Sequence, residues 1–265
     1  MNTNGYAMED ILNYTLQLAD TNLILAQRNA EWCGHGPVLE QDIAITNISL
    51  DLLGQARNFY QYAALVINET GTGAAATEDT LAYLRSEREF KNLLITELPV
   101  GDWAQTILRQ FFFSVYQYCL YGQLQKSNDL QLAAIAQKSL PEVRYHVKWS
   151  SEWVIRLGDG TQESKGRMLK AIDNLWPYTG EFFTPADYET EKITGFDLAD
   201  LKFQWLGKTI DILNEATIGA SVPQNETGAG TFMQTGGKQG IHTENLGFIL
   251  AEMQYLQRMH PGAQW

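Results

Sequence analysis

One histidine lies where a helical metal site would need it, but its partner ligand is missing. The segment Pro141–His146 reads Pro-Glu-Val-Arg-Tyr-His. A di-iron helical bundle would carry Glu-x-x-His here, because side chains three residues apart share a helix face and carboxylate and imidazole both suit iron. His146 is present, but Val143 precedes it by three positions, and a hydrocarbon side chain cannot bind a metal ion. The pattern indicates a metal-binding helix that has lost a ligand.

The other ligand positions of such a bundle show the same loss. The segment Asp51–Gln55 reads Asp-Leu-Leu-Gly-Gln, where a di-iron bundle would have Asp-Glu-x-x-His. Over four helices, the positions in register are Asn22, Leu52, Gln55, Ser114, Val143 and His146. Only His146 keeps a metal-binding side chain, and a lone histidine in a bundle is more often a hydrogen-bonded residue than a ligand. We therefore predict no metal site, no catalytic residue and no cofactor in this chain.

Two displaced carboxylates keep an alternative open. Glu142 lies one position from Val143, which rotates it by about 100° around a helix. Glu31 is the other candidate, although a solvent-exposed or interface role is favoured for it. A metal-dependent oxidase that uses His146 with Glu31 or Glu142 is the alternative that these residues leave open.

Other catalytic patterns have less support. The four histidines lack a serine or cysteine in a strand-turn-helix elbow, so no nucleophilic triad is expected. The loop Thr235–Gly240 reads Thr-Gly-Gly-Lys-Gln-Gly, and glycine amides with a lysine can bind phosphate. It lacks the spacing of a phosphate-binding P-loop, so a structural turn before the last helix is the favoured interpretation.

Composition excludes several classes of function. The chain has 265 residues, of which 45% are hydrophobic, and a net charge of −12, which makes nucleic-acid binding improbable. Cys33 and Cys119 form no zinc or redox motif and are expected to be reduced thiols. The N-terminal residues resemble no secretory signal, and no apolar run is long enough to span a membrane. The expected location is the cytoplasm.

Helical periodicity dominates the chain and must position these residues. We predict a single all-α domain over residues 1–265, with a ferritin-like four-helix-bundle core and additional helices. The core helices are expected at about 10–32, 37–68, 102–126 and 129–158, and the additional helices at about 161–183, 198–218 and 243–259. One face of the second core helix is expected to be apolar, with Ile45, Ile48, Leu52, Ala56 and Phe59. Asp102 and Asp129 are expected to cap helices, and Pro141 to kink one. A short charged helix is expected from Glu78 to Asn92, and a long loop or lid from Gly219 to Thr243.

Several stretches together resemble the C subunits of phenylacetyl-CoA epoxidases, which are multicomponent bacterial ring monooxygenases. The stretches are Glu31–Pro37, Leu50–Phe59, Arg144–His146, Asn214–Thr217 and Thr235–Trp265, and the resemblance covers nearly the whole chain. The resemblance implies a non-catalytic structural subunit for aerobic phenylacetate catabolism. Such a subunit pairs with a ferritin-like catalytic A subunit, which carries the iron pair and epoxidises the aromatic ring of phenylacetyl-CoA.

The same resemblance implies further partners. They are a small B subunit and a reductase with flavin and iron–sulfur centres, which passes electrons from NADPH to the reaction with O2. In A subunits the second helix carries Asp-Glu-Ala-Gly-His, so Asp51 and Gly54 match while Leu52 and Gln55 replace the two ligands. The sequence leaves open whether the isolated chain is a monomer or a homodimer. No nucleic-acid or membrane partner is expected.

Contact with the CoA-bearing substrate is a further expectation from the resemblance. The residues that would border CoA are Glu89, Phe90, Lys91, Asn92, Thr190, Glu191 and Lys192. Lys91 and Lys192 could meet phosphate, although plain surface charge is the simpler interpretation. An acyl-CoA-binding module without chemistry is therefore the third hypothesis.

Overall fold

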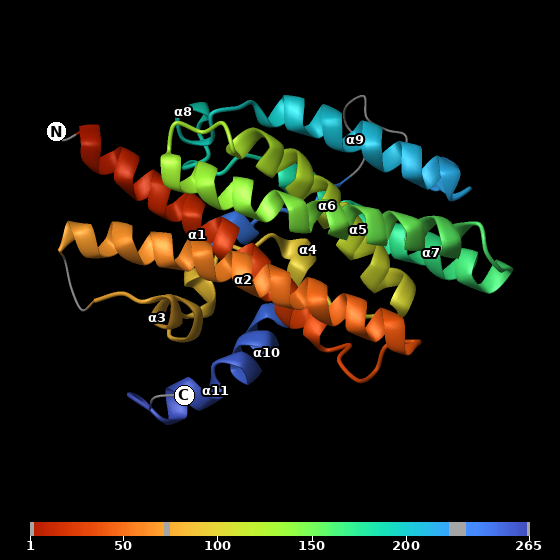
Figure 1. Ribbon diagram of the computed structural model, residues 1–265, viewed down its shortest axis with the longest axis horizontal. Coiled ribbons are helices and arrows are strands. Elements are labelled where there is room, and N and C mark those ends of the chain that lie inside the picture. Colours follow the sequence, from red (N-terminus) through yellow and green to blue (C-terminus); the bar gives the residue numbers. More distant parts are fainter. Residues whose placement is uncertain (1–2, 72–74, 223–231, 264–265) are drawn as a thin grey trace. The chain divides into compact units, whose positions relative to one another are not determined.

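The computed structural model describes residues 3–71, 75–222 and 232–263, without the side chains of residues 3–7, 70 and 192. Within these ranges every regular element is a helix and none is a strand, so the predicted all-α class is confirmed (Figure 1). The described part of the chain has no helix long and apolar enough to cross a membrane. Residues 223–231 lie outside the description, and the predicted loop or lid at Gly219–Thr243 falls partly on them.

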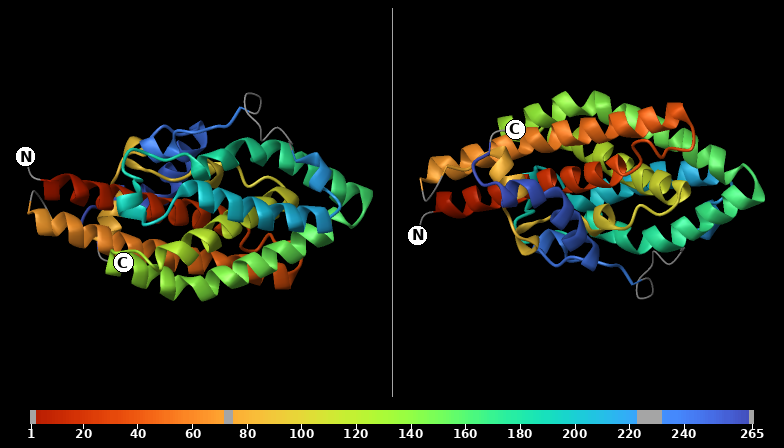
Figure 2. Two further views of the ribbon diagram at one scale, coloured as in Figure 1. Left: turned by 90° about the horizontal axis from the view of Figure 1, so that it is seen from above. Right: turned by 90° about the horizontal axis from the view of Figure 1, so that it is seen from below.

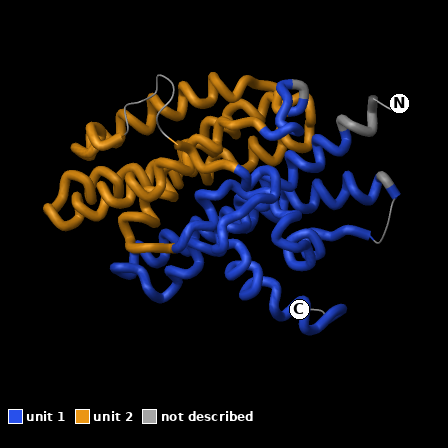
Figure 3. Tube along the Cα trace, turned by 180° about the vertical axis from the view of Figure 1, so that it is seen from behind, with its two compact units in different colours: residues 1–99, 186–193, 236–265 blue, residues 100–185, 194–235 orange. Residues whose placement is uncertain are grey.

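The chain divides into two compact units (Figure 3). Unit 1 is formed by Met1–Pro99, Ala186–Ile193 and Gly236–Trp265, and unit 2 by Val100–Pro185 and Thr194–Thr235. Each unit contains a pair of long helices that follow one another in the chain and pack together. Such helix pairs are the components of a ferritin-like bundle. The single-domain organisation over 1–265 stays a prediction.

Unit 1 is built on the helices α1 (Thr3–Ala30) and α2 (Leu39–Thr70). The face of α2 predicted to be apolar is buried, with Ile45, Ile48 and Phe59 each at 0% exposure. Residues at spacings of three and four share one side of a helix, so this face packs against α1. The helix ends at Gly71, whose φ of 68° lies in the left-handed region that glycine adopts readily.

Short elements complete unit 1. They are α3 (Glu78–Tyr83), η1 (Glu87–Glu89), α4 (Leu94–Glu97), η4 (Gly237–Gln239), α10 (Glu244–Met253), α11 (Tyr255–Met259) and most of α8 (Glu191–Thr194). Helix α10 lies beside η1 and α4. The right-hand view of Figure 2 shows the blue C-terminal helices from below. The predicted charged helix from Glu78 to Asn92 is therefore wrong in its second half, where the chain forms η1 and an extended segment.

Unit 2 is built on α5 (Trp103–Leu124) and α6 (Leu130–Gly158). The predicted caps are confirmed: Asp102 accepts a hydrogen bond from the Gln105 amide at 3.0 Å, and Asp129 accepts one from the Leu132 amide at 2.9 Å. Helix α6 runs without interruption through Pro141. The helices α7 (Gln162–Leu175) and α9 (Leu198–Glu215) pack against both long helices of this unit.

Aromatic side chains fill the core of unit 2. Trp205 on α9 packs against Phe112 on α5 with ring centroids 5.8 Å apart. The Trp205 indole also donates a hydrogen bond to the Phe112 carbonyl at 2.9 Å, which satisfies its polar atom in the buried core. Trp176 and Phe182 lie in the same cluster, each with its ring 5.8 Å from that of Trp205.

Two predicted helices end earlier than expected, and a third is divided. The helix predicted at 161–183 stops at Leu175 and continues as the 3₁₀ helix η2 (Trp176–Phe183), where Pro177 lacks a backbone donor. The helix predicted at 198–218 stops at Glu215, before Thr217 with its positive φ of 62°. The last predicted helix, 243–259, is divided at Gln254 into α10 and α11.

Candidate functional site

Three of the six expected ligand positions lie in unit 1 and are buried. Asn22 on α1 is 2% exposed, while Leu52 and Gln55 on α2 are 0% and 1% exposed. The Asn22 amide donates a hydrogen bond at 2.8 Å to the carbonyl of Leu18, one turn earlier in its own helix. This part of the set offers two neutral amides and a hydrocarbon, whereas an iron pair needs carboxylates.

The other three positions lie in unit 2 and are fully buried. Ser114 on α5 accepts a hydrogen bond from the Gln110 side chain at 2.8 Å. Val143 and His146 share one face of α6, both at 0% exposure. The spacing of a Glu-x-x-His pair is thus retained on an inward face, but its first member is a hydrocarbon.

These residues do not fit a di-iron centre. Such a centre needs Glu or Asp from two helices and Glu-x-x-His from two more, whereas this donor set holds a single imidazole. The displaced carboxylates do not complete this ligand set. Glu31 is exposed and forms an ion pair with Arg28 at 2.7 Å, and Glu142 is only partly buried. Among the described residues, no group of three His, Cys, Asp or Glu side chains is placed to hold a metal ion.

The expected CoA-bordering residues all belong to unit 1, and most of them have internal partners. Glu89 accepts hydrogen bonds from the amide and hydroxyl of Ser86 at 2.7 and 2.6 Å. Phe90 is fully buried, and the buried Asn92 donates to Glu97 at 3.0 Å. Phe90 and Asn92 are buried and are poorly placed to meet a ligand, whereas Glu89 is exposed beside its partner Ser86.

Lys91 differs from its neighbours. Its ammonium lies 5.4 Å from the centre of the Tyr188 ring. The expected stretch 89–92 therefore lies close to the other expected stretch, 190–192. The Lys91 side chain is half-buried, and burial lowers the pKa of this amine below its usual value. Thr190 and Glu191 are exposed, while the side chain of Lys192 lies outside the described residues. Among the expected residues whose side chains are described, Glu89, Lys91, Thr190 and Glu191 keep surface that a ligand could reach.

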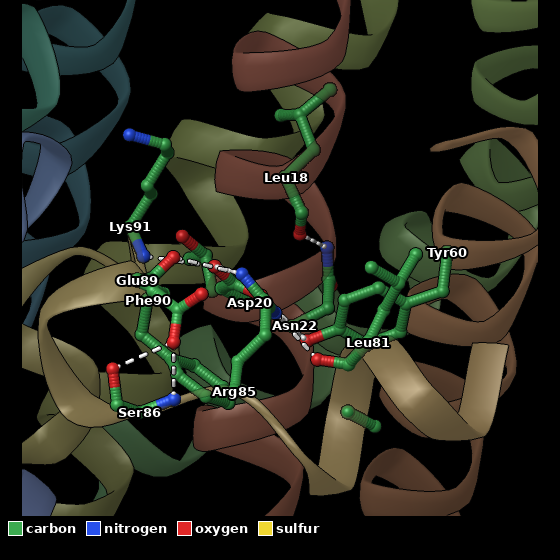
Figure 4. A network of polar contacts seen from close by, with 12 residues as sticks. Leu18, Asp20, Asn22, Tyr60, Leu81, Arg85, Ser86, Glu89, Phe90 and Lys91 are labelled. Atoms are coloured by element: carbon green, nitrogen blue, oxygen red, sulfur yellow. Dashed lines mark hydrogen bonds and ion pairs between the residues drawn. The ribbon is translucent and has the colours of Figure 1, made fainter. Parts of the chain in front are cut away.

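A buried ionic network, not predicted from the sequence, lies behind Lys91. Asp20 on α1 is fully buried, and it accepts hydrogen bonds from Tyr60 on α2 at 2.6 Å and from the Lys91 amide at 2.8 Å (Figure 4). The guanidinium of Arg85 forms an ion pair with Asp20 and also donates to the carbonyls of Leu81 and Glu89. Burial and the charge of Asp20 raise the pKa of Tyr60 well above its usual value. The network thus ties α1 and α2 to the segment after α3.

A second buried pair holds the start of α10. The Glu97 carboxylate lies 3.0 Å from Nδ1 of His242 and accepts a hydrogen bond from the Thr243 amide at 2.6 Å. The other ring nitrogen of His242 lies 2.9 Å from the carbonyl of Phe90. Both ring nitrogens face acceptors, so only the protonated imidazolium donates to both. Burial lowers the pKa of His242, but the hydrogen bond and charge of Glu97 outweigh it, so the pKa is raised.

A third buried pair involves Lys238, the lysine of the glycine-rich loop Thr235–Gly240. The Lys238 amine is 0% exposed and donates to Glu189 at 2.7 Å, while the Lys238 carbonyl accepts a hydrogen bond from Tyr188 at 2.9 Å. The amine that a phosphate site would use is therefore paired inside the protein. The favoured interpretation, a structural turn before the last helix, agrees with these contacts.

The remaining reactive groups do not form a site. Cys33 is exposed and Cys119 is buried, and both are free thiols as expected from their spacing. Burial raises the pKa of the Cys119 thiol to about 11, which keeps it protonated and unreactive.

Comparison with known proteins decides the family. The family described as phenylacetic acid catabolic protein matches residues 2–265. The chain belongs to this family. The C subunit of the 1,2-phenylacetyl-CoA epoxidase of Escherichia coli strain K12 is 46% identical over 261 residues, which cover 97% of this chain and 100% of that protein. The resemblance found in the sequence is thus confirmed.

Proposed function

We propose that this chain is a non-catalytic subunit of a 1,2-phenylacetyl-CoA epoxidase that acts in aerobic phenylacetate catabolism. One observation carries the proposal. The chain is similar along nearly its whole length to an epoxidase subunit, yet five of the six ligand positions hold neither a carboxylate nor an imidazole. Its task is then to pair with a catalytic subunit that has the full ligand set. The reductase, the small B subunit, NADPH and O2 belong to the same proposal.

The packing of the ligand positions supports a structural role. Leu52 and Val143 replace carboxylates with hydrocarbon, and both are fully buried. Replacing buried charges with well-packed apolar groups is often neutral or stabilising. A subunit that no longer needs to hold metal can therefore use these positions for stability.

Reconstitution tests this proposal. The chain and the catalytic subunit are purified separately and together, and each preparation is supplied with the remaining subunits, NADPH, O2 and phenylacetyl-CoA. We expect stoichiometric co-purification, no turnover with this chain alone and turnover with the pair. Turnover by the chain without the catalytic subunit favours the oxidase alternative. Tight CoA binding by the chain alone, lost in Lys91→Ala, favours the acyl-CoA-binding module.

A further inference from the structure

The outer face of α2 carries an apolar stripe that the core of unit 1 does not cover. Leu39, Ile43, Leu50 and Leu53 are 72%, 51%, 59% and 44% exposed. At 100° per residue they fall within an arc of about 80°, on the side away from the buried Ile45–Phe59 face. Spacings of three, four and seven are typical of a helix that packs lengthwise against another helix. Gly54, beside the stripe, has no atom within 4 Å of the place where a Cβ would lie, so it leaves room for a close neighbour.

The stripe leads into a cavity of about 250 Å³ in unit 1. The cavity lies between α2 and α3, and Leu53 belongs to both the stripe and the cavity wall. Its apolar lining residues are Leu23, Leu53, Ala56 and Ala82. Polar groups come from Arg57, Tyr60, Glu78, Asp79 and Tyr83. A cavity of about 150 Å³ is enough to take benzene, so this one has room for the ring of an aromatic side chain. Side chains that fill such pockets contribute most of the binding energy of an interface.

The charges around the stripe are mainly negative. Glu40 and Asp51 lie on one flank of α2, and Glu78 and Asp79 lie at the cavity. Arg57 continues the line of the stripe, but it is already paired with Glu78 at 3.3 Å. A second copy of this chain, which has a net charge of −12, would bring the same acidic flank against itself. The flank therefore fits a helix from a different protein that presents basic residues.

We propose that the α2 face from Leu39 to Leu53, with the adjoining cavity, is the surface that binds the catalytic subunit. The proposal rests on the proposed function and specifies its partner surface. The occupant is a helix of the catalytic subunit with an apolar stripe, a basic flank and one aromatic side chain that enters the cavity. The exposed aliphatic side chains become buried on binding, and the acidic flank orients the approaching helix.

A pair of leucines on the same helix provides a matched test. Leu50 lies in the stripe and Leu65 lies beyond the cavity, and they are 59% and 57% exposed. The full chain carrying Leu50→Glu or Leu65→Glu is titrated with the purified catalytic subunit, after circular dichroism and thermal melting confirm that both variants fold. We expect Leu50→Glu to weaken binding by about tenfold or more and Leu65→Glu to leave it within about twofold. Asp79→Lys is expected to slow association at low salt.

Each outcome decides between the alternatives. Equal binding by Leu50→Glu and the wild type overturns the proposed surface, as does an equal loss in both leucine variants. Sedimentation of the isolated chain tests the other occupant: a dimer that Leu50→Glu abolishes, with binding to the catalytic subunit intact, assigns the face to a second copy. If the wild-type chain does not bind the catalytic subunit at all, the proposed function fails rather than the assignment of the surface.

Discussion

At the residue scale, the six expected ligand positions are all buried, and only His146 has a side chain typical of an iron ligand. His146 keeps the inward position and full burial that a ligand would have, but the residue one turn earlier is Val143. Asn22 and Ser114 are satisfied by hydrogen bonds within their own helices.

The account predicts that Val143→Glu destabilises the protein. The new carboxylate would be buried without a positive partner. Either the folded protein becomes less stable, or the carboxylate takes up a proton. The expected loss in the free energy of unfolding at pH 7 is roughly 3–5 kcal/mol, measured by urea denaturation. Tyr145→Glu, at an exposed position of the same helix, is the control and should change it by about 0.5 kcal/mol or less. A thermal midpoint unchanged or raised in Val143→Glu would contradict the account.

At the element scale, buried ion pairs join segments of unit 1 that are far apart in the sequence. Asp20 on α1 forms an ion pair with Arg85, which follows α3. Glu97 at the end of α4 forms one with His242, which precedes α10. Glu189 holds Lys238 in the turn that precedes α10. Because α3, α4 and α10 are short, each gains its fixed position from these pairs more than from its own helical hydrogen bonds.

The Asp20 network predicts a large difference between two arginine variants. Arg85→Met leaves the buried Asp20 carboxylate without its ion pair, and the expected cost is roughly 3–5 kcal/mol. Arg57→Met removes an exposed ion pair with Glu78, which contributes about 0–1 kcal/mol. Urea denaturation of both variants beside the wild type measures the two values. Similar small losses in both variants would show that the network does not tie these helices together.

The Glu97–His242 pair predicts a dependence of stability on pH. The pKa of His242 is raised in the folded state above its ordinary value of 6.5, so folding favours the protonated ring. The protonated His242 ring stabilises the fold fully at pH values below the pKa of this histidine in the unfolded chain. This stabilisation is lost as the pH rises through the pKa in the folded protein. The amount lost is about 1.4 kcal/mol for each pH unit by which the pKa is raised.

His242→Gln isolates this contribution, because glutamine cannot take up a proton. Free energies of unfolding are measured for both proteins from pH 5.5 to 9. The advantage of the wild type should be largest at the acidic end and should shrink as the pH rises. An advantage that grows with pH would mean that the neutral ring is the form that stabilises the fold.

At the scale of the whole molecule, local signals were readable from the sequence and distant pairings were not. The buried face of α2 followed from the spacing of Ile45, Ile48 and Phe59, and the caps from Asp102 and Asp129. Asp20 and Arg85 are separated by 65 positions, and Glu97 and His242 by 145, so no spacing rule connects them. The prediction that this chain lacks a metal site could be made from the sequence because hydrocarbon side chains such as Leu52 and Val143 cannot bind a metal ion.

The most direct test of the central claim is the iron content of the isolated chain. The protein is loaded with Fe(II) without oxygen, desalted and analysed for iron, and the catalytic subunit is treated in the same way as a positive control. We expect close to no iron in this chain and about two atoms in each catalytic subunit. About two atoms bound to this chain would contradict the argument from Leu52 and Val143 and would identify the chain as a di-iron protein.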